Sequence, residues 1–396
     1  MKALNDNTHP LESLLKQHCP NGVEFKELGE LWEKAPKSKM GANQAKNLSK
    51  NNGNICFTSG ETHYFIDDYL VDGEFLFLND GGTADIKYNS GKAYYTDHIF
   101  AFTSQKICVK FLYYFLKDKQ EAINKTCFQG TGLKNLQKNK IEKFPIPLPP
   151  LEIQYKIVEI LDAFTELQAE LQAELEARLK QYHYYRNKLL SHDELENRTA
   201  KSRNDSDPTP LVPYVSLGEV CEKVFAGGDL PKEYSKDKKP SGEFLYPIYS
   251  NGSDENSLYG FSKTYRIDAE AVTISARGTI GFHTTREAKF TPIVRLITLI
   301  PNLNKITNRF LNYALYTTHI EKYGTSAGIP QLTIPMLEKI TIPLPPLVVQ
   351  EEIVELLDKF DTLTNDLTSG IPAEIEARKK QYEYYRERLL SFIAKD

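Results

Sequence analysis

The apolar positions of this chain follow a helical period over two unusually long stretches. In the first stretch they run through Ile157, Ile160, Phe164, Leu167, Leu171, Leu175, Leu179, Tyr182, Tyr185 and Leu189. Steps of three and four place them on one stripe, which predicts a helix that begins near Leu151 after the prolines of PLPPL. A matching stretch begins near Leu347. Gly370 and Pro372 interrupt it, so its helix is predicted to kink there before it resumes.

The segments that precede these helices carry the pattern of strands. EFLFLND, HIFAFTS, AVTISAR and IVRLITLI are short runs rich in β-branched and aromatic residues, with Gly, Asn and Ser between them. FLYYFLKDKQEAI and RFLNYALYTTHIEKY each predict one short helix. Each segment is therefore predicted to be a small mixed domain of strands and helix.

Both kinds of segment occur twice, which indicates an internal duplication. IPLPPLEIQYKIVEILDAF at 146–164 returns as IPLPPLVVQEEIVELLDKF at 342–360, an offset of 196 residues. ELEARLKQYHYYRNKLLS at 174–191 returns as EIEARKKQYEYYRERLLS at 374–391, an offset of 200. DGGTAD at 80–85 has a weaker echo in ARGTIG at 276–281. The change of offset places a gain or loss of four residues near the repeated unit LQAELQAE.

The duplication also predicts the architecture. Two long apolar stripes in one chain most simply bury each other as an antiparallel, coiled-coil-like pair, because duplicated units tend to associate about a pseudo-two-fold axis. The fold class is predicted to be α+β (mixed α/β), with two strand-rich domains in an inverted arrangement, separated by the two helices. The alternative is that each helix packs on its own domain. The predicted segments are a lead-in at 1–20, a first domain at 21–150, a central helix at 151–191, a flexible linker at 192–211, a second domain at 212–346 and a C-terminal helix at 347–396.

Charge is unevenly distributed among these segments. The chain has 396 residues and a net charge of −4, which alone would argue against a phosphate-bearing partner. Residues 21–150 hold 17 basic and 15 acidic residues, and residues 212–346 hold 15 and 13, so each has a net charge of +2. Residues 151–211 hold 8 basic and 12 acidic residues, and residues 347–396 hold 7 and 11, so each has −4. Mildly basic domains on acidic helices suit a protein that touches phosphates with part of its surface.

Several classes of protein are disfavoured by missing motifs. The five cysteines are scattered without a C-x-x-C pair, so neither a disulfide framework nor a zinc site is indicated. No apolar run approaches the length of a membrane span, and a cytoplasmic protein is expected. Glycine-rich nucleotide motifs, G-x-S-x-G, H-E-x-x-H and the N-P-P-Y motif of adenine methyltransferases are not found. We therefore expect no catalytic residue and no metal ligand in this chain.

The polar loops favour recognition of DNA. Loops flanked by Gly combine amide, hydroxyl and basic side chains with a closely approaching backbone, and these groups suit base edges and phosphates. An ordinary solvated loop is the alternative at each position. The candidate DNA-binding residues are Lys37, Lys39, Asn43, Gln44, Lys46, Asn79, Gly81, Gly82, Thr83, Lys87, Tyr249, Ser250, Asn251, Arg277, Gly278, Thr279 and Arg286.

Two related pairs of segments recur on either side of divergent domains: PIPLPPLEIQYKIVEILDAF with QYHYYRNKLL, and IPLPPLVVQEEIVELLDKF with QYEYYRERLLSF. With these segments the chain resembles the specificity (S) subunits of Type I restriction-modification systems. The resemblance covers essentially the whole chain. It implies that each domain reads one half of a bipartite DNA target, and that the helices set the spacing and dock two methyltransferase (modification) subunits. These subunits would recruit the restriction and translocase subunits.

The resemblance further implies that the chemistry belongs to the partners. S-adenosylmethionine, ATP and magnesium would be bound by them, and this chain would carry no cofactor. The LQAE units would act as a ruler, because each adds about 6 Å of helix and about 40° of rotation beyond a full turn. The alternative is a helix-favouring segment that slipped during replication. The residues expected to serve spacing or docking are Leu167, Leu171, Leu175, Tyr182, Tyr185, Tyr382 and Tyr385.

Arginine is unequally shared between the two domains. Residues 21–150 contain no Arg and 11 Asn, so the bidentate contact of Arg with guanine is unavailable to the first domain, and its half-site is expected to depend less on guanine. Two other functions compete with DNA recognition by a specificity subunit. One is a coiled-coil adaptor without DNA specificity, and the other is a fused restriction-methylation enzyme.

Overall fold

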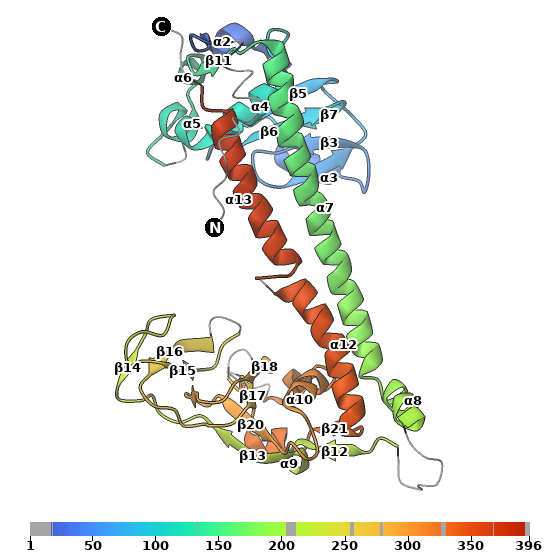
Figure 1. Ribbon diagram of the computed structural model, residues 1–396. Coiled ribbons are helices and arrows are strands. Elements are labelled where there is room, and N and C mark those ends of the chain that lie inside the picture. Colours follow the sequence, from blue (N-terminus) through green and yellow to red (C-terminus); the bar gives the residue numbers. More distant parts are fainter. Residues whose placement is uncertain are drawn as a thin grey trace. The chain divides into compact units, whose positions relative to one another are not determined.

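The computed structural model describes residues 17, 19–132, 134–202, 211–253, 257–277, 280–325, 330–366 and 368–392. The chain divides into two compact units, which we call unit 1 (residues 1–172 and 374–396) and unit 2 (residues 173–373). Each unit contains a strand-rich domain and parts of the long helices (Figure 1). In the described residues no helix is long and apolar enough to cross a membrane.

Unit 1 builds its domain on two small sheets. Its elements before the long helix are β1 (Phe25–Glu27), α2 (Leu28–Leu31), β2 (Glu33–Lys34), α3 (Ala42–Asn47), β3 (Asn54–Phe57), β4 (His63–Ile66), β5 (Glu74–Asn79), β6 (Ile86–Ser90), β7 (Ala93–Tyr95), β8 (Ile99–Thr103), α4 (Val109–Asp118), α5 (Gln120–Cys127), β9 (Phe128–Gln129), β10 (Asn135–Leu136), α6 (Lys138–Glu142) and β11 (Pro145–Pro147). One sheet has the order β2-β8-β5-β6 and the other β4-β3-β7. β3 pairs antiparallel with β4 and parallel with β7.

Strand β5 is buried on both faces, which explains its nearly continuous apolar sequence. Side chains alternate along a strand, so Leu76 and Leu78 face the cluster that contains Phe111 of α4. Phe77 faces the opposite side and packs with Phe57 of the second sheet. The run predicted as one helix is interrupted after α4, and α5 follows separately.

Unit 2 repeats this plan. Its elements are α8 (His192–Ser202), β12 (Tyr214–Ser216), α9 (Leu217–Val220), β13 (Cys221–Ala226), β14 (Tyr234–Ser235), β15 (Tyr246–Tyr249), β16 (Leu258–Ser262), β17 (Ala271–Ile274), β18 (His283–Arg286), β19 (Thr291–Pro292), β20 (Ile297–Pro301), α10 (Asn308–Leu315), η2 (Ile320–Tyr323), α11 (Ile334–Leu337) and β21 (Thr341–Pro343). The sheet β13-β20-β17-β18 corresponds to β2-β8-β5-β6, and in β14-β16-β15-β19 strand β15 again has one antiparallel and one parallel neighbour. The duplication predicted from the sequence is therefore present in the fold.

The predicted strand IVRLITLI starts later than its sequence suggests. Val294 and Arg295 have positive φ angles of 49° and 62°, so they form a turn, and β20 begins only at Ile297. The β-branched and aromatic runs at β5, β8 and β17 are strands as predicted.

The long helices are α7 (Leu151–Leu189), α12 (Leu347–Asn365) and α13 (Ile371–Leu389). Both helices that follow PLPP begin at the predicted residue. In unit 1 the beginning of α7, at Ile153 and Ile157, packs in one cluster with the end of α13 at Leu389, so these segments run antiparallel (Figure 1). In unit 2 the end of α7, at Leu189, packs in the same way with the beginning of α12 at Ile353. The antiparallel pairing of the apolar stripes is thus confirmed within each unit.

The second helix is broken, as Gly370 and Pro372 predict. Helix α12 ends at Asn365 and α13 begins at Ile371, so Pro372 lies in the first turn, where its missing N–H costs nothing. A side chain at Gly370 would lie 2.4 Å from the Thr362 carbonyl oxygen, so this position requires glycine. Helices α12 and α13 hold 19 residues each, 38 together, against 39 in α7. The four residues by which the copies differ are therefore accommodated by the break, and the helical residues remain matched.

The linker predicted at 192–211 is wrong in its first half. Residues 192–202 form helix α8, and residues 203–210 lie outside the described part of the chain. The prediction failed because one apolar side chain is sufficient to attach a short helix: Leu195 is completely buried in the core of unit 2. Arg198 adds ion pairs to Glu194 within α8 and to Glu352 of α12.

Each domain is attached to its long helix by the same polar contacts. Buried Gln154 of α7 accepts a hydrogen bond from the Cys108 amide (2.9 Å) and thereby caps α4, and Gln350 of α12 accepts one from the Thr307 amide (2.9 Å) before α10. Such caps satisfy amides that the first turn of a helix leaves without partners. The two helices α4 and α10 are therefore held in equivalent positions on the long helices.

Candidate nucleic-acid interface

The loop after β5 contains the candidates Asn79, Gly81, Gly82 and Thr83. Asn79 is only 3% exposed, and its amide donates to the carbonyls of Ser59 (2.7 Å) and Thr83 (3.3 Å). Its polar atoms are used inside the domain, and it presents none to a ligand. Asn79 therefore fixes the shape of the loop, whereas the exposed Thr83 lies at its surface.

Lys87 is also engaged within the domain. Its ammonium group donates to Asn79 Oδ1 (3.2 Å) and to the Thr58 carbonyl (3.1 Å), and it pairs with Asp85 at 2.8 Å. Burial raises the pKa of Asp85, but hydrogen bonds from Lys87 and Lys117 outweigh it and hold this pKa below its usual value. Lys87 therefore supports the loop from beneath, and the sequence offered no sign that it would be paired.

The glycines of this loop approach a second segment, which holds none of the candidate residues predicted from the sequence. Gly81 forms an isolated antiparallel bridge with Asn135, and the Gly82 amide donates to the Lys134 carbonyl at 2.7 Å. Gly82 has a φ of 83°, which favours glycine. Lys134 and Asn135 are exposed beside the loop and join the candidate surface. Their signal was the second Gly-Thr pair just upstream, in QGTGLKN.

The polar run that begins at Lys37 is oriented by alternate burial. Ser38 and Met40 are buried, which leaves Lys37 and Lys39 exposed between them. Helix α3 follows and is anchored by the buried Ala45. The other candidates of this run, Asn43, Gln44 and Lys46, are exposed on α3.

The two candidate segments of unit 1 meet at one turn. The Asp97 amide donates to the Met40 carbonyl (2.9 Å), and the Asp80 amide donates to the His98 carbonyl (2.9 Å). Residues Lys37 to Met40 and the loop after β5 are therefore both fastened to residues 97–98. The structure brings them together although about 40 residues separate them in the sequence.

Unit 2 places Tyr249 and Arg286 in direct contact. The Arg286 guanidinium lies 3.7 Å from the centre of the Tyr249 ring and donates to Thr273 Oγ1 (3.0 Å) and Ser257 Oγ (2.9 Å). Burial lowers the pKa of Arg286 from its ordinary value. This arginine is thus largely satisfied inside the domain, where it positions the Tyr249 loop.

The rest of this loop is held to the end of β17. Asn251 Oδ1 accepts from the Ala276 amide (3.0 Å), and its amide group donates to the Val294 carbonyl. Ser250, partly buried, donates its amide to the Ser257 carbonyl (2.8 Å). The exposed Arg295 lies next to Val294, so the turn at 294–295 brings beside the candidate loop a basic side chain that is not among the candidates predicted from the sequence.

The two units share one arrangement at the end of the central strand. Gly81 bridges Asn135 in unit 1, and Arg277 bridges Gln331 in unit 2, with both partners shifted by 196 residues. Arg277 is exposed, while the candidates Gly278 and Thr279 lie outside the described residues. Each domain thus presents a loop and a second strand-like segment side by side. This arrangement carries amide and basic side chains at one rim of each domain.

The residues expected to serve spacing or docking differ in burial: Tyr182 is buried, Tyr185 is 36% exposed and the others are partly buried. Tyr182 is 4% exposed and belongs to the core of unit 2, and Tyr185 stacks on Phe360 with ring centres 5.6 Å apart. In unit 1, Tyr385 stacks on Phe164 at 5.4 Å. Leu167, Leu171, Leu175 and Tyr382 are partly buried. The expectation that Tyr182 docks a partner is therefore wrong, because its side chain packs within its own unit.

The middle tyrosines of the two QYxYYR segments face solvent instead. Tyr184 is 61% exposed and Tyr384 is 53% exposed. They occupy equivalent positions at the offset of 200 residues. Exposed tyrosines on a helix are suited to a protein partner, because they combine a large apolar ring with a polar tip.

Metal-binding chemistry is not indicated in the part of the chain that the structure covers. Among the described residues no group of three or more His, Cys, Asp or Glu side chains could hold a metal ion. The five cysteines are free, and burial raises the pKa of Cys56 to about 11 and that of Cys221 to about 12. Raised pKa values keep these thiols protonated at neutral pH, so neither is a reactive thiolate.

Comparison with known proteins identifies the family. A family model described as the Type I restriction modification DNA specificity domain matches residues 20–181 and again residues 212–377. A putative type I specificity subunit from Mycoplasma pneumoniae is 36% identical over 345 residues, which cover 83% of this chain and 96% of the relative. A putative type I restriction enzyme specificity subunit from Haemophilus influenzae is 32% identical in an alignment of 421 positions, gaps included, that covers 98% of this chain and all of the relative.

A solved structure shares the fold at lower sequence identity. The crystal structure of the S subunit of a Type I restriction-modification system from M. genitalium has a TM-score of 0.64 and 19% identity, and the match covers 99% of each chain. The chain therefore belongs to the family of Type I restriction-modification specificity subunits, as its repeated motifs suggested.

Proposed function

We propose that this chain is the DNA-reading subunit of a Type I restriction-modification complex, and that each strand-rich domain reads one half of a bipartite target. The observation that carries this proposal is the repeated rim geometry, in which Gly81 with Asn135 and Arg277 with Gln331 occupy equivalent positions. The backbone positions are equivalent in the two domains, but the side chains around them differ. Two copies of one scaffold with different polar side chains suit the reading of two different sequences.

The long helices are proposed to set the gap between the half-sites and to dock methyltransferase subunits. Tyr184 and Tyr384 are the exposed aromatic side chains that support this part of the proposal. Methyl transfer and ATP-dependent cleavage would be carried out by the partner subunits, which would bind S-adenosylmethionine, ATP and magnesium. Two methyltransferase subunits are proposed to bind, and the mass of the purified complex measures this stoichiometry.

A map of methylated bases tests the proposal. Cells that express this chain together with its methyltransferase subunit are expected to show a two-part methylated motif with a degenerate gap, and cells without this chain should lack it. Exchange of residues 21–150 for the matching domain of a relative should change one half of the motif only. Formation of the complex without any sequence preference in methylation would favour the adaptor function and contradict DNA reading.

A further inference from the structure

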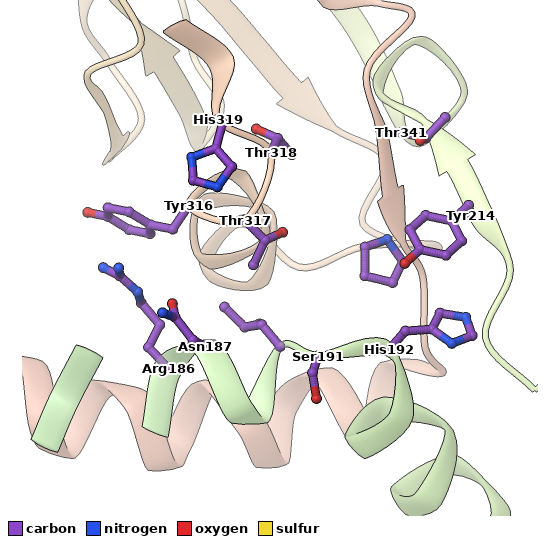
Figure 2. A pocket seen from close by; sticks show the side chains of 12 residues that line it. Arg186, Asn187, Ser191, His192, Tyr214, Tyr316, Thr317, Thr318, His319 and Thr341 are labelled. Carbon is purple, nitrogen blue, oxygen red and sulfur yellow. The ribbon is translucent and has the colours of Figure 1, made fainter. Parts of the chain in front are cut away.

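Unit 2 contains an open groove of about 460 Å³ where α7 ends. Arg186 and Asn187 of α7 form one wall, and Tyr316, Thr317 and His319 form the opposite wall. Figure 2 shows Arg186 extending from α7 toward the Tyr316 ring. None of these residues belongs to the candidate DNA-reading rim.

The guanidinium of Arg186 is held in place, and within the described segments no carboxylate neutralises it. Its central carbon lies 4.2 Å from the centre of the Tyr316 ring and 5.6 Å from that of Tyr182. Its Nε atom is buried without a hydrogen-bond partner, and no ion pair joins this side chain to a carboxylate among the described residues. A cation fixed against two aromatic rings, with a neutral tyrosine hydroxyl beside it but no carboxylate in the described part of the chain, is prepared to bind an anion.

Unit 1 contains the matching arginine in a different state. Arg386, at the offset of 200 residues, also lies 5.6 Å from the ring of its tyrosine, Tyr382. Its Nε atom lies 3.1 Å from Asp118 Oδ1 at the end of α4, an ion pair that does not have the geometry of a hydrogen bond. Unit 1 therefore supplies a carboxylate to this arginine from its own chain.

The position of Asp118 is occupied by Thr317 in unit 2. Tyr114 of α4 and Tyr313 of α10 are equivalent, because each donates to an aspartate of its long helix at 2.6 Å. Their offset of 199 residues carries Asp118 onto Thr317, which is exposed and lines the groove. In unit 1 the arginine of the duplicated site is thus paired with a carboxylate of the same unit, whereas in unit 2 the groove beside the matching arginine is open.

We propose that the groove at Arg186 binds a carboxylate of a partner polypeptide, and that this carboxylate occupies the place that Asp118 holds in unit 1. The proposal rests on the proposed function, in which the partner is a methyltransferase subunit. An Asp or Glu side chain, or a C-terminal carboxylate, matches the planar guanidinium. The groove is large enough to admit a side chain of this kind together with part of its backbone.

A protein carboxylate fits this groove better than a DNA phosphate. The matching guanidinium of Arg386 pairs with a carboxylate in unit 1, so the geometry of the site is suited to that group. Helix α12, which packs on the end of α7, holds five acidic residues and one lysine. A net charge of −4 on the neighbouring helix repels a polyanion but permits a single, locally paired carboxylate.

Substitution Thr317→Asp tests the proposal in the full-length chain. It gives unit 2 a carboxylate at the position that Asp118 holds in unit 1. Arg186 should then pair within its own chain, and the groove should no longer accept a carboxylate of the partner. Titration with the methyltransferase subunit is expected to show at least about a tenfold weaker affinity in one binding step, with unchanged or higher thermal stability. Thr264→Asp adds the same charge at an exposed position of unit 2 away from the groove and should leave the affinity unchanged.

A second variant makes the outcome independent of folding effects. Arg186→Gln should weaken the same binding step. The double variant should bind the methyltransferase subunit no more weakly than the single variant with the lower affinity, because both changes remove the same contact. Unchanged methyltransferase affinity in Thr317→Asp would overturn the proposal. The proposal would also be overturned if the assembled complex, at saturating methyltransferase, bound DNA more weakly while the affinity for the methyltransferase subunit was unchanged. That result would assign the groove to a DNA phosphate. Failure of the proposed function would appear separately, as wild-type complexes that assemble but methylate without sequence preference.

Discussion

The Tyr313 hydroxyl donates a 2.6 Å hydrogen bond to Oδ1 of Asp358. The same bond joins Tyr114 to Asp162 in unit 1, also at 2.6 Å. Burial and then the bonded carboxylate raise the pKa of each tyrosine, so both remain neutral donors. A contact kept in both copies of a duplicated chain indicates that it fixes how a domain is attached to its helix.

Loss of the Tyr313–Asp358 hydrogen bond should lower the stability of unit 2. Tyr313→Phe is expected to lower the free energy of unfolding by about 1.5 kcal/mol, at the lower end for a bond to a charged group, because Asp358 keeps its ion pair with Arg309. Chemical denaturation of the purified chain measures the change. Tyr323→Phe, at an exposed tyrosine, is the matched control and should have no effect. Equal stability of the two variants would refute the anchoring role.

Alkaline pH should destabilise unit 2 through Tyr182. Burial, followed by the nearby Asp361, raises the pKa of Tyr182 to about 12. An unfolded tyrosine has a pKa of about 10, so above this pH the unfolded state loses a proton that the folded state keeps. The free energy of unfolding should then fall by up to about 1.4 kcal/mol per pH unit from this one group. Denaturation between pH 9 and pH 11 should show a shallower fall for Tyr182→Phe than for the wild type, and identical slopes would contradict it.

The long helices and the buried strands were predictable because their patterns are regular. A stripe such as the one through Phe164 and Leu189 has a single helical solution, and the prolines before Leu151 set its start. The continuous apolar run at β5 similarly indicated a strand covered on both faces. Helix α8 was missed because its one buried apolar side chain, Leu195, leaves no periodic apolar pattern to detect.

The candidate site was predictable by region but not by residue. The loops were found because Gly and Asn mark them, yet Asn79 is used inside the domain, and the exposed Lys134 comes from a segment about 50 residues away. Whether a polar side chain faces inward or outward depends on tertiary contacts such as that of Arg286 with Tyr249. Such contacts join distant segments, and a local pattern does not encode them.

The exposed tyrosine of the first QYxYYR segment should affect partner binding without affecting the fold. Tyr184→Ser is expected to weaken methyltransferase binding and to change the free energy of unfolding by less than about 0.5 kcal/mol, because this ring is 61% exposed. Tyr182→Ser, two residues earlier, should instead destabilise unit 2 by about 3 kcal/mol or more. Binding titrations and denaturation of both variants separate the two roles. A Tyr184→Ser chain that binds like the wild type would show that this ring is not part of the docking surface.

Arg277 should read a guanine in the second half-site. It is exposed at the rim of unit 2, whereas the first domain contains no arginine. Arg277→Gln is expected to reduce discrimination at one base pair of the second half-site by about 1–3 kcal/mol and to leave the first half-site unchanged. Competition binding with single-base variants of the mapped target measures this effect. Lys134→Gln is the reciprocal control, since its effect should fall on the first half-site only.

Deletion of one LQAE unit should shorten the gap between the half-sites while preserving both of them. The two units occupy Leu167–Glu174 within the uninterrupted helix α7, and one deletion would reduce it from 39 to 35 helical residues. About 6 Å of helix and about 40° of rotation are removed, which is close in size to one or two base-pair steps of DNA. The break between α12 and α13 already absorbs a four-residue difference, so the partner helices have a place where the mismatch can be taken up. Mapping of methylated bases with the deleted chain should return both half-sites at a shorter spacing. An unchanged motif would exclude the ruler, and it would leave the repeat as a helix-forming segment whose length is not read.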